Sequence, residues 1–309
     1  MTIPFPPRRV AVFAWLLCVG FGIGLRADTV TLFPSADATL IELRPSNSIG
    51  AASWISAGTT QEGHSNRALL KFDVAAAIPI GSTITDAGLN VWVTRQPVDG
   101  YDEKTFSLRR VLRAWGEGTN PGPAISPGFG LPAGPGDATW SHCFFGTNTW
   151  SQPGGQEGID YSADVTTTVL IAEVRANPYF FEAVTADVQF WVDHPESNFG
   201  WMLKTEDELS RFTARRFGSR ELEDPFESPQ LEITYLPPVH TQIAKTNNSV
   251  LLSFNADVGH FYQVEARAVL SGTNSWMVLT NLGLVFSTGT LTATDSITNA
   301  QRFYRVRRD

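Results

Sequence analysis

The 309-residue chain has a formal net charge of −8, with 31 acidic residues against 23 Lys and Arg. An acidic chain without a local basic stripe holds a phosphate backbone poorly, so we expect no nucleic-acid partner. The same balance disfavours acidic polysaccharides as ligands, unless a bound cation bridges the charges.

The N-terminus has the order of a secretory signal peptide. Arg8 and Arg9 precede an apolar run over 10–24, and the small residue Ala27 follows it. This run of roughly 15 residues is shorter than the ~20 needed to cross a bilayer. We therefore expect cleavage of 1–27, no transmembrane anchor, and a secreted protein of the periplasm, outer surface or extracellular space. Cleavage removes three arginines and no acid, which leaves 20 basic residues against 31 acidic ones, or −11.

The exported part would keep a single cysteine, Cys143. No disulfide within the chain is then available, so the fold has to rely on its apolar core. The remaining 282 residues suffice for one large core or two smaller ones. No partnered His and Asn pattern accompanies Cys143, which we interpret as a buried thiol and not as a nucleophile.

Short β-patterned runs separated by turn residues recur from Asp28 onward. Leu89, Val91 and Val93 share one face of such a run by their spacing of two, whereas Trp92 points the other way. Many short strands with Gly, Pro and Asn between them are typical of a β-sandwich or jelly roll. The runs cover 29–33, 68–72, 87–94, 106–112 and 230–235.

One segment has helical spacing instead. Val188, Trp191 and Val192 lie at i, i+3 and i+4, with Thr185 as the expected N-cap and Pro195 as the stop.

The sequence after residue 236 starts a second β pattern. Pro237 and Pro238 form the expected linker between a first domain over 28–236 and a second over 239–309. Alternating apolar residues then continue through 250–254, 261–266, 276–279 and 302–306. The predicted fold class is all-β: a jelly-roll-like β-sandwich followed by a small fibronectin-like β-sandwich.

The first domain contains a series of short motifs in a fixed order, at 37–39, 47–50, 67–73, 84–89, 115–118, 137–140, 187–191, 198–201 and 217–221. In this order they resemble the DNRLRE family, also grouped as carbohydrate-binding module family 96 and related to the repeats of archaeal disaggregatase. The resemblance spans roughly 28–236 and implies a non-catalytic, secreted β-sandwich associated with polysaccharides. The second domain, which ends in the motif at 302–306, resembles a C-terminal module of large secreted proteins of Verrucomicrobia-like bacteria.

The segment 116–160 is rich in glycine and proline, and long irregular segments in compact domains are often functional. Two tryptophans within it, Trp140 and Trp150, have polar neighbours that could contact sugar hydroxyls: His142, Asn148 and Gln152. We expect a sugar-binding platform here, with Trp150 the more exposed ring. The alternative is that both indoles fill the core beneath a long loop.

Two further tryptophans have the same pair of interpretations. Trp92 is a ligand contact if its sheet face is open, and a core residue if that face is covered. Trp54, near a turn, has the same ambiguity.

Oxygen-rich strand ends offer a structural calcium site. Asp37, Asn47 and Asp73 are the expected ligands, without the fixed spacing of an EF-hand loop. A looser acidic set lies over 157–164. The five histidines lack partners at ligand spacing, so zinc is not expected.

An enzyme is the main alternative to a binding protein. A polysaccharide hydrolase or lyase would need carboxylates facing each other across a cleft. No motif selects two of the acidic residues in or beside the long loop, and we expect no catalytic residue. A structural envelope protein is the third hypothesis. The acidic residues are Glu117, Asp137, Glu157, Asp160 and Asp164.

Overall fold

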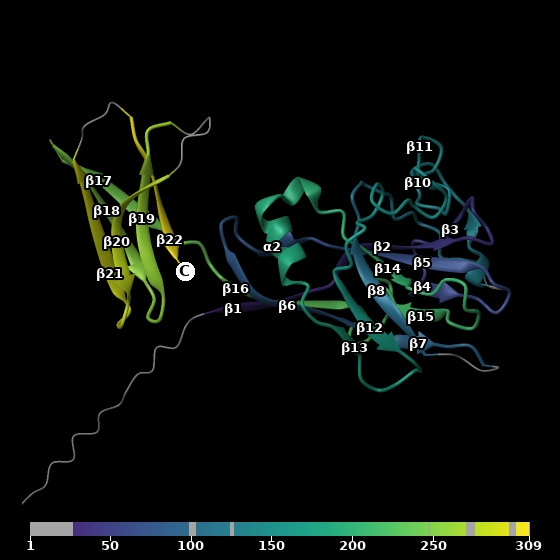
Figure 1. Ribbon diagram of the computed structural model, residues 1–309. Coiled ribbons are helices and arrows are strands. Elements are labelled where there is room, and N and C mark those ends of the chain that lie inside the picture. Colours follow the sequence, from purple (N-terminus) through teal and green to yellow (C-terminus); the bar gives the residue numbers. More distant parts are fainter. Residues whose placement is uncertain are drawn as a thin grey trace, which may run out of the picture. The chain divides into compact units, whose positions relative to one another are not determined.

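The computed structural model describes residues 27–98, 103–123, 127–246, 248–269, 276–296 and 301–308. These residues form two compact units, which we call the N-terminal unit (27–238) and the C-terminal unit (239–308) (Figure 1). The predicted signal peptide lies outside the described residues, apart from Ala27. In the part of the chain that is described, no helix has the length and apolar character to cross a membrane.

The N-terminal unit is built almost entirely of short antiparallel strands, and the predicted all-β fold class is confirmed. Its first eight strands are β1 (Asp28–Leu32), β2 (Pro34–Ile41), β3 (Asn47–Ser48), β4 (Trp54–Thr59), β5 (Ser65–Phe72), β6 (Thr83–Val91), β7 (Val93–Arg95) and β8 (Lys104–Arg110). The others are β9 (Leu131–Pro132), β10 (His142–Phe144), β11 (Asn148–Thr149), β12 (Thr167–Ile171), β13 (Tyr179–Phe181), β14 (Trp201–Thr205), β15 (Arg215–Gly218) and β16 (Gln230–Leu236). The helices are α1 (Val74–Ala77), α2 (Thr185–Asp193), η1 (Pro127–Phe129) and η2 (Pro195–Ser197).

Two sheets form the sandwich. The smaller has the order β1-β16-β6-β13; the larger has the order β12-β8-β14-β5-β4-β15-β7, with β2 paired to β5. Strands distant in sequence are neighbours in both sheets, so the topology is jelly-roll-like and not a simple meander.

The main core lies between these sheets and is closed by helix α2. Leu70 and Leu203 of the large sheet and Leu89 of the small sheet are fully buried in it. Trp191 of α2 packs on Trp201 with ring centroids 4.4 Å apart. The helix was predicted from this apolar spacing.

The predicted cap of this helix is wrong. The N-cap residue is Val184, with no side-chain hydrogen bond, and Thr185 is already helical. Packing of the apolar face therefore stabilises the helix without a capping side chain.

Gly88 lies inside β6, where a residue with a side chain is usual. Its neighbour on the adjacent strand explains why glycine is found there. A Cβ at this position would lie 2.1 Å from Cζ of Phe180, so the aromatic ring of β13 covers the glycine. An aromatic side chain over a strand glycine compensates for the missing packing surface.

A second core lies beneath the glycine-rich segment. Leu40 and Leu69 of the large sheet, Met202 of β14 and residues of the segment pack together there. Cys143 is 1% exposed within this cluster, as predicted for a buried thiol. The described parts of 116–160 therefore form a folded cover with its own apolar contacts.

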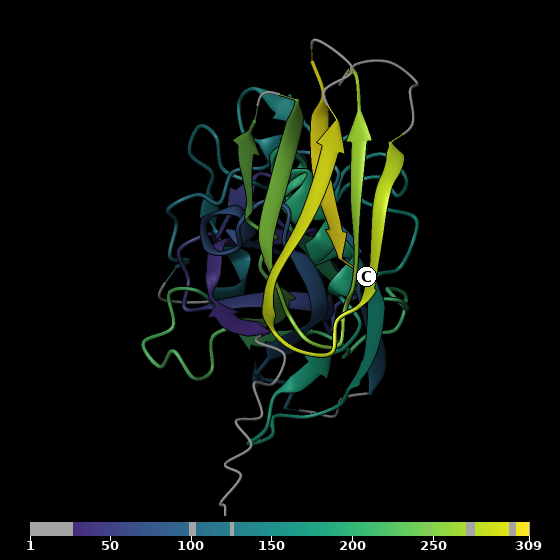
Figure 2. The same cartoon turned by 90° about the vertical axis from the view of Figure 1, so that its left-hand side faces the viewer.

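The C-terminal unit is a small sandwich of two three-stranded sheets, β17-β18-β21 and β20-β19-β22. Figure 2 shows its strands running side by side along one direction. Leu252, Phe254, Tyr262 and Val264 are buried between the sheets. The strands are β17 (Thr241–Lys245), β18 (Ser249–Ala256), β19 (Phe261–Arg267), β20 (Met277–Leu284), β21 (Gly289–Ser296) and β22 (Phe303–Arg308).

Candidate functional site

The two tryptophans of the glycine-rich segment are buried. Trp150 is 3% exposed and Trp140 is 8% exposed. Trp150 donates a hydrogen bond from Nε1 to the carbonyl of Thr139 at 2.9 Å, so its one polar group is satisfied internally. The prediction that Trp150 is exposed is wrong, and the indoles fill the core beneath the segment. A buried ring offers no face to a sugar.

The polar residues predicted beside these indoles therefore do not form a sugar-binding platform with them. His142 is half-buried, and its ring contacts Phe145 with centroids 5.0 Å apart. Asn148 and Gln152 are exposed. Trp92 is half-buried between β6 and β7. These four residues do not line the pocket described below.

The predicted calcium ligands do not come together. Asn47 donates a hydrogen bond to the carbonyl of Phe129, and Asp73 accepts one from the amide of Ala76 at the start of α1. Asp37 is buried elsewhere, beside other carboxylates. Spacing along the sequence failed here because the three side chains have separate partners: Asp73 caps a helix, whereas Asn47 and Asp37 bond to residues distant in sequence.

Asp37 instead meets Glu117 and Glu221, with one oxygen of each within 4.8 Å of the others. Arg220 lies among them: it pairs with Glu117 at 2.8 Å and Glu221 at 2.9 Å, and its amide donates to Asp37 at 2.7 Å. Burial raises the pKa of Asp37 well above its ordinary value and also raises the pKa of Glu117.

The guanidinium of Arg220 thus supplies the positive charge that a calcium ion would bring. The donor set fits a closed ion network better than a calcium site, because a cation would have to displace an arginine already bound to two carboxylates.

The carboxylates of the enzyme alternative are mostly engaged in the fold. Asp137 accepts from Ser48 at 2.6 Å, and the fully buried Asp160 accepts from the amides of Ser151 and Gln156. Hydrogen bonds from Arg113 and these amides outweigh the desolvation of Asp160 and lower its pKa. Groups held in this way serve the loop structure, and they form no open pair across a cleft.

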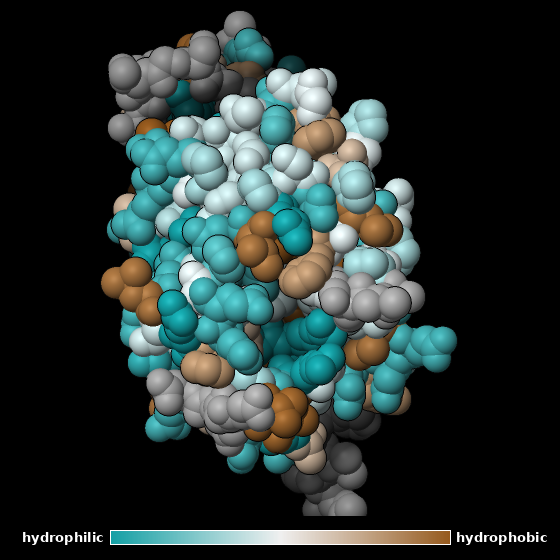
Figure 3. All heavy atoms as spheres, turned by 90° about the vertical axis from the view of Figure 1, so that its right-hand side faces the viewer, coloured by the Kyte–Doolittle hydropathy of each residue, from teal (hydrophilic) through white to brown (hydrophobic). Residues whose placement is uncertain are grey.

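A pocket of about 480 Å³ opens on the N-terminal unit beside β4. This volume lies within the ~300–1,000 Å³ range of small-ligand sites. Figure 3 shows a largely hydrophilic face of the molecule with separate hydrophobic patches and a recess near its middle. The lining residues come from the end of β2, from β4, β5, β7, η1 and β15, and from the loops that follow β2, β4 and β7 or precede β15: Ile41, Leu43, Trp54, Ser56, Thr60, Gln61, Glu62, Asn66, Arg95, Gln96, Pro97, Val98, Gly128, Phe129, Ala214, Arg215 and Arg216.

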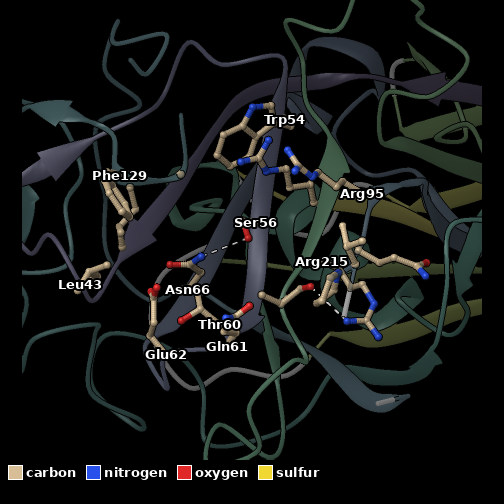
Figure 4. Close-up of a pocket in the computed structure, with 17 residues that line it drawn as sticks. Leu43, Trp54, Ser56, Thr60, Gln61, Glu62, Asn66, Arg95, Phe129 and Arg215 are labelled. Atoms are coloured by element: carbon tan, nitrogen blue, oxygen red, sulfur yellow. Dashed lines mark hydrogen bonds between the residues drawn. The ribbon is translucent and has the colours of Figure 1, made fainter. Parts of the chain in front are cut away.

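The pocket has an apolar wall and a polar floor (Figure 4). Phe129, which is 38% exposed, and Leu43 form the wall. Asn66 lies across from them and donates from Nδ2 to Ser56 at 3.3 Å. An aromatic face opposite amide and hydroxyl groups is the combination that a sugar ring requires.

Three arginines and one glutamate line the pocket. Arg215 is 1% exposed and donates to the carbonyls of Ala172 at 2.6 Å and Phe212 at 3.2 Å, so it supports the pocket wall. Arg216 stacks on Trp54, with its Cζ 3.8 Å from the ring centroid. Burial lowers the pKa of Arg216, and the nearby charge of Arg95 lowers it further.

Sequence reasoning pointed to part of this site. Trp54 was weighed as a ligand contact, but nothing singled out Arg95, Arg216 or Phe129. Arg95 and Arg216 become neighbours only because β7 pairs with β15. A pairing between strands so distant in sequence has no local signal.

Comparison with known proteins adds no family to these observations. No family model matches the chain, and no curated protein matches it. The resemblance to the DNRLRE family therefore stays a prediction from the motifs.

Proposed function

We propose that this chain is an exported, non-catalytic carbohydrate-binding protein. Its N-terminal unit would bind a polysaccharide or a cell-surface glycan in the pocket beside β4. The observation that supports this most is that Phe129, whose ring is 38% exposed with Arg44 Cζ 5.2 Å from its centroid, lines the same cavity of about 480 Å³ as Asn66. This proposal replaces the platform expected around Trp150 with a different aromatic site on the same unit.

The pocket supplies both kinds of contact that a sugar makes. The C–H face of a pyranose ring can pack on Phe129 and Leu43, which removes apolar surface from water. Amides and hydroxyls around Asn66 and Ser56 can exchange hydrogen bonds with the ring hydroxyls. Asn66 is 9% exposed and already bonded to Ser56, so its amide is held in place before a ligand arrives.

Isothermal titration against a glycan panel, with the protein lacking 1–27, tests the proposal. Phe129→Ala should lower the affinity for any bound glycan roughly tenfold, since an aromatic packing contact contributes about 1 kcal/mol or more. Phe226→Ala is the matched control, because Phe226 is 76% exposed and lies outside the pocket. Equal losses in both variants would contradict the pocket assignment.

The same samples separate the alternatives. Release of shorter products from a polysaccharide would favour the hydrolase or lyase. Absence of binding across a broad panel would contradict the carbohydrate-binding proposal and favour a structural envelope protein.

A further inference from the structure

Two arginine side chains oppose each other at one end of the pocket. Arg95 of β7 and Arg216 of β15 are direct cross-strand partners, and both line the cavity. Like charges at such positions are destabilising, so this arrangement costs folding free energy. The charge of Arg95 also lowers the pKa of Arg216, after the larger effect of burial.

Neither guanidinium has an acidic partner in the part of the chain that the structure describes. The other two stacked arginines on described strands of the large sheet each have an acidic partner. Arg67 pairs with Glu208 at 2.7 Å, and Arg110 with Asp187 at 3.8 Å. Glu62 is the single acidic residue of the pocket lining, and it forms no ion pair with the described arginines. The pocket is therefore a local concentration of positive charge on an acidic chain.

We propose that Arg95 and Arg216 together bind one anionic substituent of the glycan, a carboxylate or a sulfate ester, and that Trp54 is a positioning residue for Arg216. The inference rests on the proposed carbohydrate-binding function. It also reverses the expectation, drawn from net charge, that acidic polysaccharides are disfavoured. The local arrangement of charge decides binding here, because fields beyond a Debye length of about 8–10 Å are screened.

The geometry suits this role in two ways. A guanidinium offers parallel N–H donors that match the two oxygens of a carboxylate or sulfate, and two guanidiniums neutralise such a group more completely than one. The Trp54 ring carries the Arg216 guanidinium at 3.8 Å on one face, which orients its N–H edge before binding. That face of Trp54 is then unavailable to a sugar. Phe129 also has a guanidinium over its ring, with Arg44 Cζ 5.2 Å from the centroid, so a sugar would pack on the part of the Phe129 ring that is exposed.

Matched ligand pairs test the inference. Polygalacturonate is compared with its methyl ester, and dextran sulfate with dextran, by isothermal titration at several NaCl concentrations. The full exported protein should bind the charged member of at least one pair at least tenfold more tightly than its neutral counterpart. That preference should weaken as salt is raised. The pair that shows the preference distinguishes carboxylate from sulfate.

Variants connect the preference to the two arginines. Arg95→Gln and Arg216→Gln should each lower the affinity for the charged ligand about 10- to 100-fold, as expected for losing hydrogen bonds to a charged group. Lys245→Gln is the control, because it removes the same charge from an exposed position of the C-terminal unit. An equal loss in Lys245→Gln would overturn the assignment to the pocket.

A thermal melt shows whether each variant is folded, and it separates a binding role of the arginines from a structural one. Arg95→Gln relieves the repulsion with Arg216, so its melting temperature should equal or exceed that of the wild type. Trp54→Phe should keep most of the affinity, whereas Trp54→Leu should lower it without changing the affinity for the neutral member. A lower melting temperature of Arg95→Gln than of the wild type would contradict the role proposed for the pair.

The failures are distinguishable. Equal binding of charged and neutral members, lost in Phe129→Ala, would leave the carbohydrate-binding function and overturn the inference. If no glycan binds, the proposed function fails. A melting-temperature rise with sodium sulfate that is absent in Arg95→Gln would then still support an anion site, and an equal rise in both proteins would overturn that as well.

Discussion

Two arginine–tryptophan stacks on the large sheet differ in their surroundings and in the charge of their neighbours. Arg67 lies 5.2 Å from the centroid of Trp140, pairs with Glu208 and donates to the carbonyl of Gly154 at 2.8 Å. Arg216 lies on Trp54 and meets another arginine. The first stack is covered by the glycine-rich segment; the second lines an open pocket.

The pKa values of the two arginines show the same contrast. Burial alone would lower the pKa of Arg67, but the hydrogen bond and charge of Glu208 outweigh it and raise that pKa. Arg216 has only the lowering effects of burial and Arg95. One residue pair can therefore serve stability or binding, according to whether the fold supplies the counter-charge.

The largest effect is expected for Trp150→Ala, in the core beneath the glycine-rich segment. Truncation leaves a large cavity and removes the hydrogen bond to Thr139, so the free energy of unfolding should fall by about 3–5 kcal/mol. Phe129→Ala, on the open side, should cost less than about 1 kcal/mol because its ring is partly solvated. Urea denaturation of both variants measures the difference. Similar losses would mean that the pocket aromatic is part of the core.

Substitution of Arg67 or Arg216 by glutamine should give the next largest difference in the free energy of unfolding. Arg67→Gln leaves Glu208 without its main partner in a site where both side chains are mostly buried, and should cost about 2 kcal/mol. Arg216→Gln should cost less than about 1 kcal/mol, because it also removes a repulsion. Chemical denaturation at low and high salt tests this, and a larger loss in Arg216→Gln would reverse our assignment.

Glycines offer a smaller, backbone-level test. Gly154 has φ of 84°, and a Cβ there would lie 2.7 Å from the ring of Trp140, so Gly154→Ala should cost roughly 1–3 kcal/mol. Gly128 borders the pocket, where the nearest atom to a Cβ is an Arg216 nitrogen at 3.7 Å. Gly128→Ala should be nearly neutral in thermal melts. Equal destabilisation by the two changes would show that the pocket rim is as tightly packed as the cover.

The ion network around Arg220 predicts a pH dependence of stability. Burial raises the folded-state pKa of Asp37, so the folded state binds a proton more tightly than the unfolded chain does. Stability is then lost as pH rises from the ordinary value of 3.8 through the raised pKa. Asp37→Asn should remove this part of the loss, so the stability of the variant should increase relative to that of the wild type as pH rises through the raised pKa. Parallel pH profiles of the two proteins would contradict this.

The strand pattern was readable because it is local. Leu89, Val91 and Val93 alternate within one run, and all three are buried. Helix α2 was predicted to follow Thr185 as its N-cap and run through Val192, and it extends over Thr185–Asp193; its apolar spacing sets its buried face. Even the glycine at 88 has a local strand context, although its covering ring comes from β13.

The amino-acid sequence by itself determined the all-β class, the positions of several strands and of α2, and the sense of the net charge, because each depends on composition or short-range periodicity. The tertiary structure alone decided which tryptophans are buried and which arginines share a pocket. Trp150 and Trp54 sit in equally unremarkable local sequence, but only the first is covered by a folded loop. Burial and charge pairing are set by long-range contacts, and these carry no signature in the spacing of neighbouring residues.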